Sequence, residues 1–121
     1  MAVYVSNLTV NTGTTFSQIF TLESASTNSA TDLTGFTASA QMRKHAGAVT
    51  GITTFTTSIY DAVGGKIQIG LSTTQTAALK PGRHVYDVIL TRPSGFKFVA
   101  VEGNALVRSG INTMVHYFGS P

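Results

Sequence analysis

The feature that most constrains the fold is a two-residue alternation of apolar and polar side chains that recurs along the chain. It is clearest from Phe36, in the run FTASAQMR, where one parity is apolar and the other is polar. Successive side chains of a β-strand point to opposite faces, so this period predicts a half-buried strand. The same rule predicts strands over residues 15–22, 53–60, 67–71, 84–91 and 96–101, and residues 105–107 are expected to continue or bulge the last of these edges after Gly103-Asn104.

The first ten residues break the alternation once. The apolar parity slips by one residue near Ser6 and Asn7. A slip of this kind is typical of a bulge or a bend between two short strands. In the strand of residues 84–91 both faces are fairly apolar, which predicts a central strand that is covered on at least part of each side.

Turn and helix signals separate these runs. Gly64-Gly65 and the segment RPSG lie between alternating runs and predict hairpins, because glycine adopts positive φ at little cost. One short helix is expected after Ser72, which with Gln75 has the spacing of a capping box, and Pro81-Gly82 is expected to end it. We expect it to connect one sheet to the other.

Many short strands with one short helix predict an all-β protein, an antiparallel β-sandwich of seven to eight short strands. We expect residues 1–110 to form the sandwich domain and residues 111–121 to form a C-terminal strand or arm. Only 11% of the 121 residues are charged, and Thr, Ser and Gly supply much of the remaining surface. Such weak net repulsion suits a protein that is packed against others.

The net charge of +3 does not indicate a nucleic-acid partner. The basic residues are dispersed, and no aromatic residues alternate with them as a single-strand binder requires. The N-terminal residues lack the pattern of a secretory signal, and no apolar run approaches the length of a membrane span. We therefore expect synthesis in the cytoplasm, no membrane partner and no nucleic-acid partner.

Residues for catalysis, metal binding or cofactor binding are not indicated. The three histidines, His45, His84 and His116, are widely separated, and no spacing presents two ligands from one element. Neither a nucleophile elbow nor a phosphate-binding glycine loop occurs, and the chain has no cysteine. We expect no enzyme activity, no cofactor and no metal.

Two of the five carboxylates could in principle form the catalytic pair of a glycosidase. Asp32 and Asp61 lie in turn contexts, where an Asp side chain bonds neighbouring amides. Asp87 and Glu102 fall in adjacent predicted strands. Either carboxylate could meet a basic residue such as Lys97 or Arg83 across the strands. A structural ion pair is the favoured interpretation.

Four segments in order resemble a recurrent family: DLTGFTASAQMRK, GKIQIGLSTTQTAAL, PGRHVYDVILTRPSG and VEGNALV. Over about residues 14–108 the chain resembles the small Ig-like β-sandwich virion structural proteins of tailed bacteriophages, of the cyanophage type. It is similar to N-terminal modules of phage baseplate proteins. His84 stands where the family commonly has Tyr, and the segment after Arg108 extends past the end of many members.

The resemblance implies a non-enzymatic, multicopy virion protein, made in the host cytoplasm, that binds other virion proteins and forms homo-oligomers. Capsid decoration or cement is the first hypothesis, and a tail, neck or baseplate component is the alternative. A surface receptor or glycan-binding module is a further alternative, with Tyr60 and Phe96 as aromatic candidates beside predicted turns.

The C-terminal segment GINTMVHYFGSP has two interpretations. It is one more strand of the same core, or it is an arm that adds to a neighbouring subunit's sheet. On the second interpretation the partner-binding residues are Met114, Val115, Tyr117 and Phe118.

Overall fold

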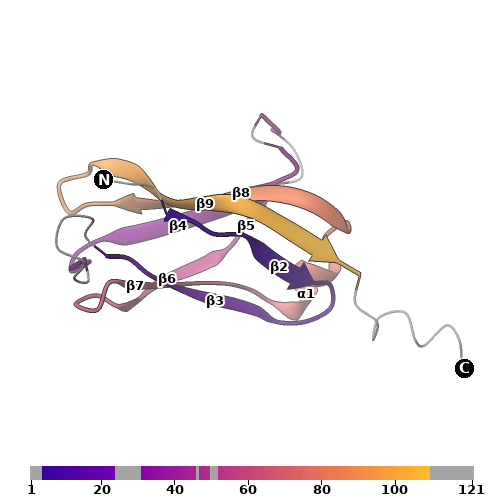
Figure 1. Ribbon diagram of the computed structural model, residues 1–121, viewed down its shortest axis with the longest axis horizontal. Coiled ribbons are helices and arrows are strands. Elements are labelled where there is room, and N and C mark those ends of the chain that lie inside the picture. Colours follow the sequence, from indigo (N-terminus) through magenta and orange to yellow (C-terminus); the bar gives the residue numbers. More distant parts are fainter. Residues whose placement is uncertain (1–3, 24–30, 46, 50–51, 110–121) are drawn as a thin grey trace, which may run out of the picture.

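The computed structural model describes residues 4–23, 31–45, 47–49 and 52–109, which form two β-sheets packed face to face (Figure 1). One helix, α1 (Thr73–Ala77), is present in this part of the chain. The strands are β1 (Tyr4–Val5), β2 (Leu8–Asn11), β3 (Phe16–Thr21), β4 (Thr37–Arg43), β5 (Thr53–Thr54), β6 (Thr56–Asp61), β7 (Lys66–Leu71), β8 (Gly82–Thr91) and β9 (Lys97–Arg108).

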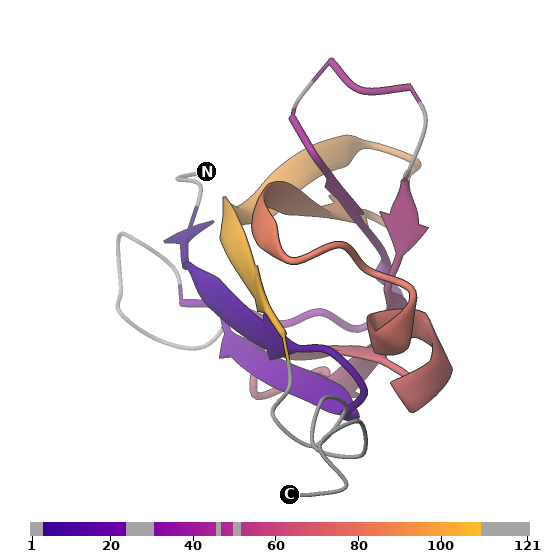
Figure 2. The ribbon, with the colours of Figure 1, turned by 90° about the vertical axis from the view of Figure 1, so that its right-hand side faces the viewer.

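The larger sheet has the order β1-β9-β8-β4-β5, and β2 also pairs with β9. The smaller sheet has the order β3-β7-β6. All pairs are antiparallel except those of β1 and β2 with β9, which are parallel. Viewed from one end, the two layers lie on opposite sides of the core, with α1 beside them (Figure 2).

The predicted all-β sandwich is therefore confirmed. The described residues contain nine strands because two of the predicted strands are each divided. The first is divided at Ser6 and Asn7, as the slip in the alternation predicts. The second is divided at Phe55, whose amide donates to the carbonyl of Ala40 at 3.0 Å. Here the chain leaves the larger sheet after β5 and joins the smaller sheet as β6.

The core consists of the apolar parity of each strand. Alternate residues of β7 and β8 are buried while their neighbours are half-buried or exposed. Burying one such aliphatic side chain contributes about 1.5–3 kcal/mol, so the alternation fixes which face of each strand turns inward. The fully buried members include Met42, Ile67, Ile69, Val88, Leu90 and Val101.

The short helix has the predicted cap. The Ser72 hydroxyl accepts from the Gln75 amide, and the Gln75 side chain accepts from the Ser72 amide. The helix ends at Ala77, before Pro81, and connects β7 of the smaller sheet to β8 of the larger. The buried hydroxyl of Thr76 donates to the carbonyl of Thr14 at 2.7 Å, which ties the helix to the turn before β3.

Of the two outcomes predicted after Gly103-Asn104, the continuous strand is confirmed and the bulge is wrong. Strand β9 continues through both residues, and its irregularity lies nearer the hairpin, between the partners of Val88 and Ile89. The backbone at Gly103-Asn104 stays extended because the Ser6–Asn7 bend pairs with it. The Asn104 amide donates to Asn7 Oδ1 at 3.1 Å, and the Ser6 amide donates to the Glu102 carbonyl at 3.0 Å.

Turns gather at the end of the sandwich opposite α1. In the turn of the β8–β9 hairpin the Gly95 amide donates to the Arg92 carbonyl at 2.8 Å, and Gly95 has φ of 95°. Gly35 has φ of 81°, and a Cβ there would lie 2.9 Å from Pro93 Cγ, so the turn before β4 packs closely on this hairpin. Among the described residues, no helix is long and apolar enough to cross a membrane.

Candidate interaction face of the larger sheet

The side chains of β4, β8 and β9 that point away from the core form one continuous surface, which we call the outer face. The opposite parity of these strands is buried, so the period of two places the remaining side chains on this surface. The outer face includes Thr37, Ser39, Gln41, Arg43, Arg83, Val85, Asp87, Ile89, Thr91, Lys97, Val99, Glu102, Asn104 and Leu106.

The strand register brings polar groups together at its centre. Asp87 of β8 lies between Gln41 of β4 and Glu102 of β9 in one cross-strand row. Val5 of β1 continues this row beyond Glu102. The row lies in a shallow depression of about 530 Å³, lined by side chains of all four strands.

Arg43 supplies the positive charge of this depression. Its guanidinium donates from Nη1 to the carbonyl of Ala48 at 2.8 Å and from Nη2 to Gln41 Oε1 at 3.1 Å. These two bonds hold the guanidinium on the outer face, where its charge acts on Asp87.

Burial raises the pKa of the Asp87 carboxyl above its ordinary value, because a partly desolvated group ionises less readily. The charge of Arg43 acts in the opposite direction and favours the ionised form. The carboxylate of Glu102, directly opposite, raises the pKa of Asp87 further. The depression therefore holds two carboxyl groups and one guanidinium, a set that suits polar contacts with another protein.

The juxtaposition of Asp87 and Glu102 confirms the hairpin predicted from the sequence, but the basic neighbour is a different one. Lys97 pairs with Thr91, and Arg83 pairs with Leu106, so neither lies opposite Asp87. Arg43 was not among the predicted neighbours of Asp87, although the alternation of FTASAQMR places Arg43 on the polar parity of its strand.

Apolar side chains surround the polar row. Val85 and Ile89 flank Asp87 along β8 and are half-buried. Val5 is 68% exposed and Leu106 is 44% exposed. The expectation that β8 is covered on part of each side is met on the core side, while within the described residues the outer side keeps these apolar groups in contact with solvent.

Asp32 and Asp61 have the turn roles expected of them. Asp32 Oδ1 accepts from the Thr34 amide and hydroxyl, and these bonds lower the pKa of Asp32. Asp61 Oδ1 accepts from the Gly64 amide at 3.1 Å. Neither turn brings its carboxylate to the outer face.

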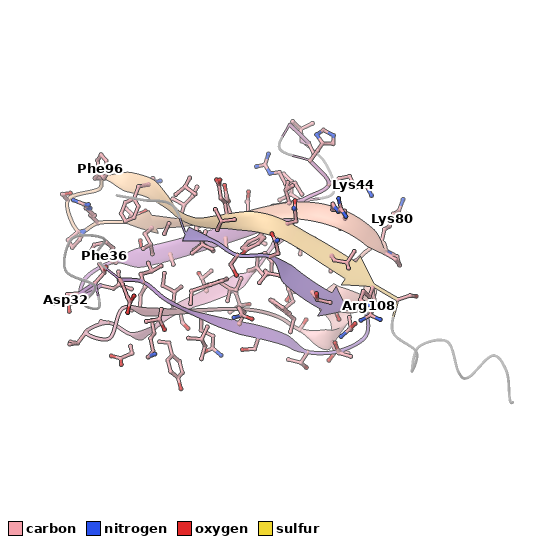
Figure 3. All side chains as sticks on the ribbon, viewed as in Figure 1. Asp32, Phe36, Lys44, Lys80, Phe96 and Arg108 are labelled. Atoms are coloured by element: carbon pink, nitrogen blue, oxygen red, sulfur yellow. The ribbon has the colours of Figure 1, made fainter. Side chains whose placement is uncertain are left out.

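The two aromatic candidates lie on different sheets. Phe96 is in the β8–β9 turn and is 59% exposed, while Tyr60 is in β6 of the smaller sheet. The Arg92 guanidinium lies 5.3 Å from the ring centroids of both Phe96 and Phe98. Phe96 and Phe36 lie at one end of the sandwich, as Figure 3 shows.

Four partner-binding residues are predicted in the C-terminal segment: Met114, Val115, Tyr117 and Phe118. They lie outside the described residues, as does the predicted domain boundary at residue 110. Their roles stay predictions. The last residue of β9, Arg108, pairs with Asn11, and the chain continues from that end of the sandwich.

Histidines and acidic residues do not gather into a candidate metal site in the part of the chain that the structure describes. His84 is buried, and its Nε2 lies 2.9 Å from the carbonyl of Lys80, a contact that anchors the start of β8. His45 is exposed in the loop after β4.

The fold is similar to a known phage protein domain. The N-terminal domain of phage TP901-1 ORF48 superposes with a TM-score of 0.55 over 85% of each chain, at 11% sequence identity. No protein-family model and no curated protein matches the sequence. At this identity the likeness shows a shared fold.

Proposed function

We propose that this chain is a non-enzymatic structural protein of a bacteriophage particle and that it binds other virion proteins through the outer face. The observation that carries the proposal is the half-apolar outer face around Asp87, which other parts of the described chain leave uncovered. A surface that mixes aliphatic residues with a few polar groups is typical of protein interfaces. The likeness to a phage protein domain supports the same assignment.

Within the particle we propose capsid decoration or cement as the role. Low charge, a rigid two-sheet body and a chain that continues beyond β9 suit a protein held by lateral contacts in many copies. A tail, neck or baseplate component uses the same properties in fewer copies. We propose that Asp87 and Glu102 act in binding and take no part in catalysis.

Fractionation of particles from an infected culture tests whether the chain belongs to the particle and whether it lies on the capsid or on the tail. Quantitative mass spectrometry should find the chain in mature particles, and copies in the hundreds on the capsid support decoration. A few copies, set by the symmetry of the tail, support the tail, neck or baseplate alternative. Absence of the chain from mature particles would overturn the proposal.

A receptor or glycan-binding module is the second candidate, and one observation favours it. The exposed Phe96 ring, which lies beside Arg92 and at a tilt to the Phe98 ring at a hairpin tip, offers an apolar surface on which a sugar ring can pack. Binding of the isolated chain to a glycan array, lost in a Phe96→Ala variant, would promote this candidate.

A further inference from the structure

Basic side chains gather at one end of the sandwich. Four of the eight Lys and Arg residues lie there, all exposed, on β8, β9 and the segments that border β4 and β8. We call this group the basic end: Lys44, Lys80, Arg83 and Arg108. Figure 3 shows Lys44, Lys80 and Arg108 at the end opposite Asp32 and Phe96.

The backbone brings these four residues together around Gly82. A Cβ at Gly82 would lie 3.4 Å from Lys44 Nζ, so the Lys44 ammonium sits over this glycine. Arg83 directly follows Gly82 in the sequence, and Lys80 precedes Gly82 by two residues. Gly82 pairs with Val107, which places Arg108 on the neighbouring strand.

No carboxylate side chain compensates this charge locally. All five acidic residues are described, and Glu23, Asp32 and Asp61 lie at the far end, where Leu22–Gly65 and Leu33–Ala62 hydrogen bonds join the segments. Asp87 is four residues from Arg83 along β8, and its partner Glu102 is four residues from Leu106 along β9, a span of about 13 Å in each strand. That span exceeds the screening length of about 8 Å at physiological ionic strength.

Like charges held together without counter-charges repel one another, and an anionic partner relieves that repulsion. Two observations favour a protein partner over nucleic acid. Leu106, 44% exposed, pairs directly with Arg83, so an apolar side chain lies within the charged group. The exposed aromatic side chains of the described residues, Tyr60 and Phe96, lie elsewhere, so stacking platforms for bases are missing beside these cations.

We propose that the basic end docks on an acidic surface of a neighbouring protein. This inference rests on the proposed function and extends it by naming the chemistry of one partner.

The four lysines of the chain give an internal control for the test. Lys44 and Lys80 belong to the basic end, whereas Lys66, on β7, and Lys97, at the start of β9, lie outside it. Acetylation of surface lysines is measured by mass spectrometry for the chain in intact particles and for the free chain. We expect labelling of Lys44 and Lys80 to fall about tenfold in particles relative to Lys66, which lies on the smaller sheet, whereas Lys97 pairs with Thr91 of the outer face.

A carbodiimide, which joins a lysine amine directly to a carboxyl group with loss of water, then identifies the partner. Amide crosslinks from Lys44 or Lys80 to Asp or Glu of another virion protein support the inference. Equal labelling of all four lysines, protection that nuclease treatment removes, or crosslinks confined to Asp87 and Glu102 of a second copy would each overturn it. If the chain is absent from particles, the proposed function fails first, and the two failures are distinguished.

A charge-reversal pair checks the same inference by an independent readout. Lys80→Glu with Arg83→Glu should reduce incorporation into particles about tenfold or more, since each exposed ion pair contributes up to several-fold in affinity. Lys80→Glu alone and Lys66→Glu alone make the same change in net charge. Lys66 lies on β7 of the smaller sheet, outside both the basic end and the outer face, so Lys66→Glu should leave incorporation unchanged. Equal incorporation of these two single variants, each shown by circular dichroism to be folded, would contradict the inference.

Discussion

The hydroxyl of Tyr86 donates a hydrogen bond to the carbonyl of Ser6, 80 residues earlier in the sequence. Tyr86 lies opposite Gly103 in the β8–β9 ladder, and the missing side chain of Gly103 lets Tyr86 reach across β9 to the bend between β1 and β2. Since the Ser6 amide bonds to Glu102, both polar groups of the Ser6 backbone are fixed. This contact holds the N-terminal strands on the larger sheet.

Tyr86→Phe should therefore lower the free energy of unfolding by about 1 kcal/mol, the usual net worth of one such hydrogen bond. The ring contacts of residue 86 with Phe20 and Phe55 remain in this variant, so the change reports on the hydroxyl. Urea denaturation measures it. Tyr60→Phe, at a ring that is 59% exposed, is the control and should change stability by less than about 0.5 kcal/mol. Equal effects of the two substitutions would show that the Ser6 contact carries no stability.

Gly103→Ala probes the same contact from the other side. A Cβ at Gly103 would overlap the Ser6 carbonyl oxygen, so the bend between β1 and β2 must move. We expect a loss of about 1–3 kcal/mol, typical of an overpacked site. Gly47→Ala is the matched control, because a Cβ there would meet only the His45 ring, at 3.7 Å or more. Thermal unfolding of both variants decides the point, and a stable Gly103→Ala protein would contradict the packing described.

Local sequence pattern predicted which residues face the core, because burial follows the period of each strand on its own. It predicted the split at Ser6-Asn7, the Ser72–Gln75 cap and the parity of β4 and β8. The parallel pairing of β1 and β2 with β9 and the Tyr86–Ser6 contact depend on how distant strands meet. Period alone carries no information on that register.

The contacts of the outer face were likewise predictable only where they lie within one hairpin. Asp87 and Glu102 share one hairpin, so a local argument brought them together. Arg43 reaches them only through the β4–β8 ladder, whose register matches Gln41 with Asp87. The basic end joins residues from three separate segments, which is why scattered basic residues in the sequence gave no sign of it.

Glu102→Gln should lower the pKa of Asp87, because it removes the negative charge that lies directly opposite. Arg43→Gln should have the opposite effect and raise the pKa of Asp87, since the guanidinium favours the carboxylate. Titration of the Asp87 carboxyl carbon by NMR measures both shifts. Shifts of the same sign in the two variants would contradict the arrangement of charges.

The raised pKa of Asp87 also sets the sign of its effect on stability. The folded chain holds this proton more tightly than the unfolded chain, so stability falls as pH rises from about 3.8 through the raised pKa. Asp87→Asn removes the ionisation, and we expect it to stabilise the protein at pH 7 more than at pH 3.

Asp32, whose pKa is lowered by its bonds to Thr34, is the opposite case. Asp32→Asn should destabilise at neutral pH, and that loss should disappear as pH falls below the lowered pKa of Asp32. Urea denaturation between pH 3 and pH 7 measures the free energy of unfolding of both variants, Asp87→Asn and Asp32→Asn.

Leu106→Glu tests whether the outer face binds a partner. Leu106 on β9 is 44% exposed and Ile19 on β3 of the smaller sheet is 38% exposed, so Ile19→Glu is a control matched in size, strand context and charge. Both variants should fold, because neither side chain belongs to the core. If the outer face is an interface, placing a negative charge within it, opposite Arg83, costs binding, and we expect Leu106→Glu to reduce incorporation into particles by about tenfold or more. Ile19→Glu should be incorporated as the unmodified chain is. Incorporation measured by quantitative mass spectrometry decides between the faces, and the reverse result would assign the interface to the smaller sheet.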